Sequence, residues 1–259
     1  MYDVEKIIDQ YFPKFDETNT ALVAAKYAVG SGGKRLRPTF ALNCADMIKA
    51  VDDKVKRIAV AIEFLHTYSL IHDDLPAMDD DDIRRGKPSC HIAFGEAAAI
   101  LAGDALQNLA FEVLADVENS SENYLKAINY IAKMSGASGM IYGQCLDISG
   151  NNLNEKQYFN MIKHKTANMF MASVVAPAIY FDIDNAQIGL LENFAENYGI
   201  LFQIADDLTD NDGWVNENKD RAIILTNNAY DNALTSLSML KYDTKYFESA
   251  LENIHSKLA

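Results

Sequence analysis

Long stretches rich in Ala, Leu, Ile and Met cover most of the chain, and proline is scarce, with five residues in 259. Such stretches favour helices over strands. The alternation of apolar and polar residues that is typical of strands is almost absent, and residues 223–225 are its one weak candidate. We predict helices over residues 3–11, 18–30, 35–50, 52–73, 92–116, 121–148, 155–179, 185–210 and 228–257.

Helix starts and irregular segments complete this picture. Asp52 and Ser121 stand where a side chain can cap a helix. We predict irregular structure at residues 31–33, 75–90, 149–154 and 211–220. Because no linker or fixed-period repeat divides the chain, we expect one all-α domain over residues 1–259, with its functional groups at helix ends.

The composition excludes several classes of partner. A formal charge of −14 argues against binding to nucleic acid or to an anionic membrane surface. Three cysteines without metal-ligand spacing indicate a reducing cytoplasm. We find no apolar run of about 20 residues that would span a bilayer, and Met1 leads into acidic residues, unlike a signal peptide. We therefore expect a soluble, cytoplasmic protein.

A first group of carboxylates follows the apolar run of residues 58–71. Asp73 and Asp74 stand at the end of this predicted helix, and Pro76 should interrupt it, so that Asp79 can fold back toward the same place. His66 falls on roughly the same helix face. A solvated acidic loop and an ordinary core histidine are the alternative interpretations.

A second group of carboxylates follows the apolar run that ends at residue 205. Gln203, Asp206 and Asp210 are spaced to lie on one helix face, where two like charges four residues apart are mildly destabilising. A shared hard cation would relieve this repulsion in both acidic groups. We therefore predict that the two groups face each other across a cavity and bind Mg²⁺.

Basic residues accompany these acids. Lys34 and Arg37, three residues apart, follow Gly33 at a loop-to-helix start, where the first backbone N–H groups have no acceptor within the helix. Arg84 and Arg85 follow the first acidic group by a few residues. Metal-binding carboxylates beside lysine and arginine are typical of a diphosphate site. An exposed basic turn and simple neutralisation of the neighbouring acids are the alternatives.

Six segments together resemble the trans-type (E-) polyprenyl diphosphate synthases, and most closely their bacterial short-chain branch, the farnesyl diphosphate synthases. They are GGKRLRP (32–38), HTYSLIHDDLPAMDDDDIRRGKP (66–88), AFGEAAAILAGDALQNLAFE (93–112), GQCLDI (143–148), HKT (164–166) and FQIADD (202–207). The resemblance implies an isoprenoid-synthase helical bundle around a central substrate cavity, usually a homodimer. It also implies condensation of isopentenyl diphosphate with dimethylallyl or geranyl diphosphate, using three Mg²⁺ ions.

The resemblance assigns a role to each matching residue. The metal ligands would be the carboxylates Asp73, Asp74, Asp79, Asp206 and Asp210, assisted by Asp80 and Asp207. The isopentenyl diphosphate site would comprise Gly33, Lys34, Arg37, His66 and Arg85. The allylic diphosphate site would comprise Arg84, Lys165, Thr166 and Gln203. Asp73, Asp79, Arg84, Lys165 and Asp206 would act directly in catalysis.

Tyr68 bears on the length of the product. It precedes Asp73 by five residues, which is about 7.5 Å along a helix. A ring at this depth would close the cavity, while the smaller Ser69 beside it leaves room. In the family, an aromatic residue here accompanies short products, so we expect a C15 product, farnesyl diphosphate. Tyr68 as an ordinary core residue is the alternative.

The chain also departs from the family pattern. The segment of residues 211–220 is short and has a single lysine, Lys219, and the C-terminal part is brief. We expect the shortness of these two segments to affect how the protein closes over the bound allylic diphosphate. Four alternatives therefore stay open: a geranylgeranyl or geranyl diphosphate synthase, a non-catalytic partner subunit, and a terpene cyclase. The second diphosphate site disfavours the cyclase, which binds one diphosphate.

Overall fold

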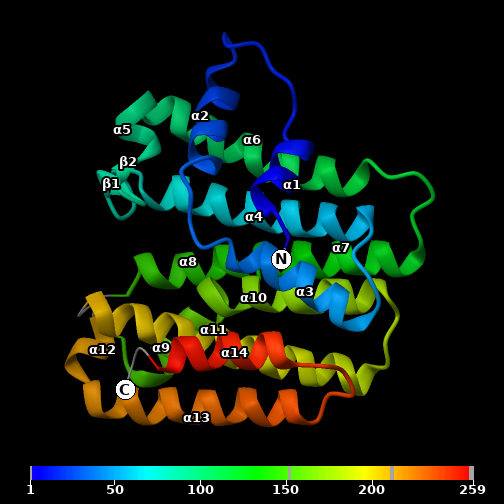
Figure 1. Ribbon diagram of the computed structural model, residues 1–259. Coiled ribbons are helices and arrows are strands. Elements are labelled where there is room, and N and C mark those ends of the chain that lie inside the picture. The colour runs from blue at the N-terminus through cyan, green and yellow to red at the C-terminus, as the bar shows by residue number, and fades with distance from the viewer. Residues whose placement is uncertain (1, 151–152, 211–212, 257–259) are drawn as a thin grey trace. The chain divides into compact units, whose positions relative to one another are not determined.

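The computed structural model describes residues 2–150, 153–210 and 213–256 and is shown in Figure 1. The described residues are mostly helical, with one short two-stranded hairpin. This confirms the predicted all-α class. The chain separates into two compact units, which are described one by one: unit 1 holds residues 1–42 and 51–120, and unit 2 holds residues 43–50 and 121–259.

Unit 1 is built around the long buried helix α4. Helices α1, α2 and α6 all pack against it, and α5 packs against α2 and α6. Asp3, Asn19 and Asp52 cap α1, α2 and α4 with their side chains, as short polar side chains do at helix starts. The elements are α1 (Val4–Tyr11), α2 (Thr20–Val29), α4 (Asp53–Asp73), β1 (Ile83–Arg84), β2 (Lys87–Pro88), α5 (Cys90–Phe94) and α6 (Glu96–Ala115). Helix α3 (Leu36–Ile48) contributes residues to both units.

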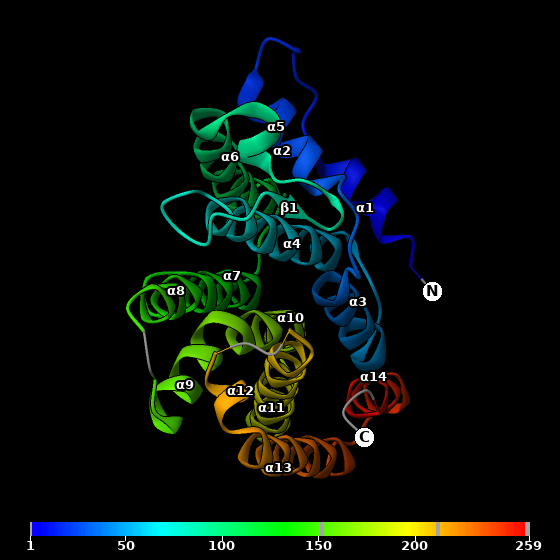
Figure 2. The same ribbon diagram turned by 90° about the vertical axis from the view of Figure 1, so that its left-hand side faces the viewer.

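Unit 2 is built around α11, which packs against α10 and α13 and lies beside α13 in both views (Figures 1 and 2). Helix α7 packs against α10, and α14 contacts α11 and α13. The elements are α7 (Glu122–Ser135), α8 (Met140–Ile148), α9 (Glu155–Ile162), the π-helix η1 (Lys163–Ala167), α10 (Asn168–Tyr180), α11 (Asn185–Asp210), α12 (Gly213–Glu217), α13 (Lys219–Ser238) and α14 (Lys245–His255).

Glycines divide two of the predicted helices. The helix expected over residues 92–116 is broken at Gly95, which has a φ of 85° and forms both the C-cap of α5 and the N-cap of α6. The helix expected over residues 121–148 is broken between Gly136 and Gly139, where α7 ends and α8 begins. Glycine ends a helix readily because it has no side chain to disfavour non-helical dihedrals.

The C-terminal third differs most from the prediction. The helix predicted over residues 228–257 is wrong: α13 already begins at Lys219, and residues 239–244 separate it from α14. The weak strand candidate at residues 223–225 is also wrong, because it lies inside α13. The predicted irregular segment 211–220 contains α12 and the start of α13, with residues 211–212 outside the described residues.

Helix α6 is relevant to the expectation that the chain has no membrane-spanning segment. Helix α6 is long and apolar enough to cross a membrane by length and composition, with 44% of its most apolar window buried inside the protein. The apolar length of residues 96–115 is thus greater than we expected from the sequence. A single such helix is weak support for a membrane span, because buried core helices share these properties.

Candidate functional site

The first acidic group lies where α4 ends and the chain turns back. Asp73 is the last residue of α4, and Asp74 is its C-cap. Asp73 is 8% exposed and Asp74 is 2% exposed. Beyond Pro76, the backbone N–H of Asp79 donates to the carbonyl oxygen of Asp73 at 2.9 Å. The loop therefore folds back to the helix end as predicted, and it brings Asp73, Asp74 and Asp79 into one turn.

A hairpin missed by the sequence analysis places the two arginines. Ile83–Arg84 pairs with Lys87–Pro88 in antiparallel register. Arg84 Nε donates to Asp74 Oδ1 at 2.8 Å, and its Nη2 donates to Asp81 at 2.8 Å. Burial raises the pKa of Asp74, and the hydrogen bond from Arg84 offsets part of this rise. Arg84 is thus held against the end of α4.

The glycine turn is shaped to receive Arg85. Gly33 has a φ of 123°, and a Cβ added there would lie 2.7 Å from Cζ of Arg85. Arg85 donates to the carbonyl oxygen of Gly32. A side chain at position 33 would require the Arg85 guanidinium to shift, and the positive φ also favours glycine. The turn and the hairpin, about 50 residues apart in sequence, therefore meet in unit 1.

Arg37 and His66 complete this basic cluster. Arg37 Nη1 lies 3.3 Å from His66 Nε2. The pKa of His66 is held well below its ordinary value by burial first, and then by Arg37, Arg85, Arg35 and Arg84. His66 is therefore a neutral imidazole at pH 7. Lys34, next to the turn, is exposed.

Arg35 was assigned no role from the sequence. It is nevertheless the most buried residue of the basic turn, residues 32–37, at 7% exposure. It adopts a left-handed φ of 46° and bonds Glu63 on α4 and Glu5 on α1. Burial acts to lower the pKa of Arg35, but its two glutamate partners raise it overall. A lone glutamate within an apolar helical run is the signal that could have indicated this pair.

The residues predicted to limit product length lie on α4. Tyr68 is 5% exposed, and burial raises the pKa of its hydroxyl to about 12, with Gln107 acting in the opposite direction. Ser69 is half-buried and donates from its hydroxyl to the carbonyl oxygen of His66 at 2.8 Å. Tyr68 thus lies inside unit 1, deeper along the helix than the acidic turn.

In unit 2, a π-helix carries Lys165 and Thr166. The segment Lys163–Ala167 has the wider turn that often marks functional sites. It lies between two glycines: a Cβ at Gly143 would be 2.1 Å from the Lys165 nitrogen, and one at Gly199 would be 2.4 Å from Cα of Ala167. Lys165 forms an ion pair with Asp147 of α8.

The second acidic group lies in the last turns of α11 in unit 2. Asp206 and Asp210 are exposed, whereas Asp207 is half-buried. Gln203 Nε2 donates to Asp207 Oδ1 at 2.8 Å, and Thr166 Oγ1 donates to Gln203 Oε1 at 2.6 Å. The structure therefore brings Thr166, Gln203 and Asp207 into one network. Lys219 is exposed at the start of α13.

The carboxylates suit Mg²⁺ in their chemistry, because this ion prefers oxygen ligands and usually takes one or two carboxylates together with substrate phosphates. Asp73 is a buried carboxylate at a helix end, which suits a role as a ligand. Among the residues that the structure describes, no three acidic, histidine or cysteine side chains are gathered as a ready-made metal cluster. The first acidic group belongs to unit 1 and the second to unit 2. That the two groups face each other stays a prediction.

Two aromatic residues near the second acidic group were missed. Tyr158 of α9 donates its hydroxyl to Asp207, and Trp214 of α12 stacks on the Tyr158 ring. Neither the hydrogen bond nor the stacked pair could be predicted from the sequence, because Tyr158 lies far from the FQIADD segment along the chain. An unexplained tryptophan beside a charged motif was the available signal.

Comparison with known proteins agrees with this arrangement. Residues 19–224 match the family described as polyprenyl synthetase. The chain is 40% identical over 213 residues to the farnesyl diphosphate synthase of Micrococcus luteus, covering 81% of this chain and 72% of that protein. It is 37% identical over 214 residues to geranylgeranyl pyrophosphate synthase 4 of Arabidopsis thaliana, covering 80% and 57%.

A solved structure extends the likeness to nearly the whole chain. The apo FPP/GFPP synthase from Zymomonas mobilis superposes with a TM-score of 0.90 at 32% identity, covering 99% of this chain and 95% of that one. The isoprenoid-synthase fold implied by the sequence is thereby confirmed. The chain belongs to the polyprenyl synthetase family of prenyltransferases.

Proposed function

We propose that this prenyltransferase is a farnesyl diphosphate synthase, which condenses isopentenyl diphosphate first with dimethylallyl and then with geranyl diphosphate. Its 40% identity to the Micrococcus luteus farnesyl diphosphate synthase supports the assignment. The single observation that carries it is the basic cluster of unit 1, which consists of Lys34, Arg37, His66 and Arg85. We propose that this cluster binds a second diphosphate, which a condensing enzyme needs and a terpene cyclase does not.

The charge balance of this cluster favours an anionic ligand. Arg85 forms no ion pair within the part of the chain that the structure describes. Burial lowers the pKa of Arg85, the charge of Glu63 acts in the opposite direction, and Arg35 and Arg84 lower it further, although the guanidinium remains charged. The charge of this buried guanidinium is therefore balanced only in part, by the carboxylates of Glu63 and Glu5. A diphosphate would neutralise it.

In this proposal each part of the cluster has its own task toward isopentenyl diphosphate. Gly33 leaves room for the Arg85 guanidinium beside the turn, while Lys34, Arg37 and Arg85 bind phosphate oxygens. His66 donates one hydrogen bond as a neutral imidazole. The substrate is thereby oriented with its double bond toward the allylic partner.

The second substrate, the allylic diphosphate, has its own group of proposed binding residues. Arg84, Lys165, Thr166, Gln203 and Lys219 are proposed to bind its oxygens, and the first two stabilise negative charge as the carbon–oxygen bond breaks. The double bond of isopentenyl diphosphate then attacks the allylic cation. The proton that is lost passes to the released diphosphate, so no protein base is needed.

Mg²⁺ is the proposed cofactor, with three ions expected. Asp73, Asp74, Asp79, Asp206 and Asp210 would hold it, and when bound it neutralises charge on the departing diphosphate. Asp74 already bonds Arg84, so this arginine also orients a carboxylate of the first acidic group.

The assembly and location are proposals as well. We propose a location in the cytoplasm, supported by the free thiols Cys44, Cys90 and Cys145, and a homodimer, which the resemblance to the family implies. A partner-dependent subunit is a second candidate. The specific observation that favours it is the short segment between Asp210 and Lys219, in which α12 leaves little chain to cover a substrate.

The deciding experiment is a measurement of product. Purified protein is given Mg²⁺, dimethylallyl diphosphate and excess isopentenyl diphosphate, and the dephosphorylated alcohols are separated by chromatography. Farnesol is expected. Geranylgeraniol or geraniol would replace the C15 assignment by another chain length. Absence of any product from folded protein would favour the partner-dependent subunit, and conversion of added geranyl or farnesyl diphosphate to a hydrocarbon without isopentenyl diphosphate would favour a cyclase.

A further inference from the structure

The chain's only tryptophan lies just beyond the second acidic group. Trp214 belongs to the short helix α12 and is half-buried. Its ring stacks on that of Tyr158, with centroids 4.9 Å apart and an interplanar angle of 22°, and it meets the edge of Phe159 at 6.3 Å. Helix α12 is thus fastened to α9 through aromatic contacts.

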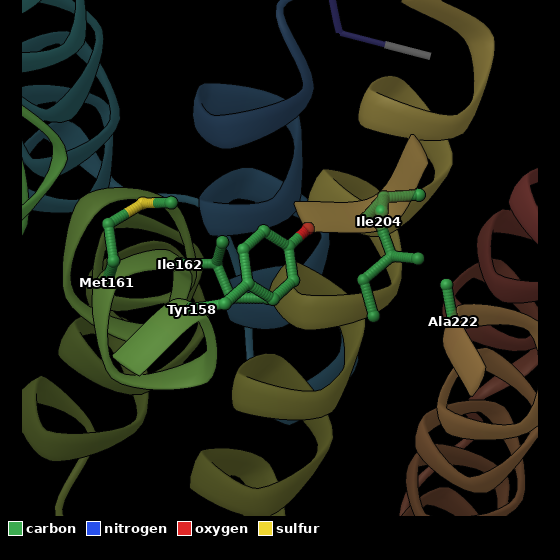
Figure 3. Packing of buried hydrophobic residues seen from close by; sticks show 6 residues of the cluster. Tyr158, Met161, Ile162, Ile204 and Ala222 are labelled. Carbon is green, nitrogen blue, oxygen red and sulfur yellow. The ribbon is translucent and has the colours of Figure 1, made fainter. Parts of the chain in front are cut away.

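Tyr158 is held by a hydrophobic cluster of unit 2. Its residue is 3% exposed and packs with Ile162, Ile204 and Val215. Figure 3 shows the Tyr158 ring lying between α9 and Ile204 of α11. A ring buried in this way has little freedom to turn, so the position of its hydroxyl is fixed.

The Tyr158 hydroxyl donates to Oδ2 of Asp207. The other carboxylate oxygen of Asp207 accepts from Gln203, which in turn accepts from Thr166. A continuous series of contacts therefore runs from Trp214 through Tyr158 to Asp207, and on to the π-helix that carries Thr166. Asp206, the neighbouring carboxylate, is exposed.

We propose that Tyr158 and Trp214 are positioning residues for the second acidic group. They hold Asp207 inward, and this fixes the rotation of the end of α11 at which Asp206 and Asp210 present their carboxylates to Mg²⁺-diphosphate. The inference rests on the proposed function, because it names the residues that orient one half of that site.

The fluorescence of Trp214 can report ligand binding at the second acidic group. A ligand that binds the carboxylates at the end of α11 changes the charge beside the Tyr158 hydroxyl. This change alters the electrostatic environment of the stacked Trp214 ring. Binding of Mg²⁺ with inorganic pyrophosphate should therefore alter the tryptophan fluorescence of the unmodified protein, without any turnover.

The test compares two tyrosine variants that each lose one hydroxyl bonded to a carboxylate. Tyr158→Phe keeps the ring and its stack on Trp214 but loses the bond to Asp207. Tyr130→Phe is the matched control, because the Tyr130 hydroxyl donates to Glu192 at 3.1 Å, also within unit 2. Fluorescence is titrated with Mg²⁺ at fixed pyrophosphate, and KM is measured for both substrates.

We expect Tyr158→Phe to need about tenfold more Mg²⁺ for half of the fluorescence change, because a hydrogen bond to a charged carboxylate is lost. KM for the allylic diphosphate should rise by a similar factor, whereas KM for isopentenyl diphosphate should stay within about twofold. Trp214→Leu should raise the allylic KM in the same way, and Trp214→Phe, which preserves a stacked ring, should restore it.

The outcomes separate the two proposals. If the unmodified protein is active and Tyr158→Phe behaves like Tyr130→Phe in both titration and KM, the positioning role is wrong and the synthase remains. If the unmodified protein makes no product but Tyr158→Phe still weakens the Mg²⁺-pyrophosphate response, the positioning role stands and the synthase fails. Equal increases in both KM values would also overturn the positioning role, since they indicate general disruption.

Discussion

Arg35 and Glu63 form an ion pair that is shielded from water almost completely. Nη1 of Arg35 lies 2.5 Å from Oε1 of Glu63, and the two side chains are 6% and 2% exposed. The pair joins the basic turn to the middle of α4, and Arg35 also bonds Glu5 of α1. It thereby sets the position of a turn whose other residues are proposed to bind isopentenyl diphosphate.

Glu63→Gln should lower the free energy of unfolding by about 3 kcal/mol, because a buried arginine would lose its buried counter-charge. Urea unfolding at pH 7 measures this change. Glu5→Gln is the matched control: its carboxylate contacts the same guanidinium but is 57% exposed, so a loss below about 1 kcal/mol is expected. Equal losses in the two variants would contradict the importance of burial.

Gly33→Ala tests the close approach of the turn to Arg85. The new Cβ would lie 2.7 Å from the guanidinium carbon, so Arg85 must move. KM for isopentenyl diphosphate should rise at least about tenfold, since charge-assisted contacts to a phosphate would be displaced. KM for the allylic substrate should change little.

Gly32→Ala is the matched control for this substitution. Gly32 also has a positive φ, of 84°, but a Cβ there would meet nothing within 4 Å. Both variants therefore share the backbone strain of an L-residue in this region, and only Gly33→Ala displaces Arg85. Similar effects on KM would show that strain, and not the displacement, is responsible.

His66 predicts a dependence of stability on pH. Its folded-state pKa lies well below the value of 6.5, so between these two values the unfolded chain binds a proton that the folded protein does not. Stability contributed by the neutral imidazole is therefore lost as pH falls below about 6.5, by at most about 1.4 kcal/mol per pH unit.

The measurement is urea unfolding at several pH values from 7.5 to 5.5, compared with His66→Gln. The variant should show a flatter profile, because the proton uptake by the unfolded chain is removed. A profile of His66→Gln parallel to that of the unmodified protein would exclude His66 as the source.

The sequence predicted best where a local signal was strong. The helix that ends at Asp73 and the turn after Pro76 follow from an apolar run and one proline, and both are present. The breaks at Gly95 and Gly136 were missed because a single glycine within a long helical pattern is tolerated, at a cost of about 1 kcal/mol, and so does not by itself mark a helix end. The β1–β2 hairpin was missed because two-residue strands carry no periodicity.

Long-range contacts within the candidate site were the least accessible to sequence reasoning. The partners of Arg35 and Asp207 are 28 and 49 residues away, and such pairings are set by helix packing. Local spacing placed Gln203 and Asp206 on one helix face, whereas the observed hydrogen bond of Gln203 is to Asp207. The residue types of the site could thus be predicted, but not which side chains hold each other.

Asp73→Asn and Asp206→Asn test the proposed metal ligands. Either change removes a charge that Mg²⁺-diphosphate would require, so kcat should fall by at least about a hundredfold. Folding should be retained, because asparagine is nearly isosteric with aspartate. Turnover with saturating substrates and a melting curve check both points.

Asp82→Asn is the control for these ligand variants, since Asp82 is exposed and only its backbone carbonyl is used, by Ser89. Its kcat should stay within about twofold of the unmodified protein, as most exposed substitutions have small effects. Near-normal turnover in Asp73→Asn or Asp206→Asn would remove that residue from the proposed ligands.

Tyr68→Ala tests the proposed limit on product length. Tyr68 lies on α4 five residues before the acidic turn, and its residue is 5% exposed, so truncation opens space inside the helical core. The product should lengthen from farnesyl toward geranylgeranyl diphosphate, because each added prenyl unit needs further depth. Tyr68→Phe keeps the ring and should keep the C15 product. If Tyr68→Ala remains folded and still yields farnesol, the ring does not form the end of the cavity, and chain length is set elsewhere along α4 or by another helix.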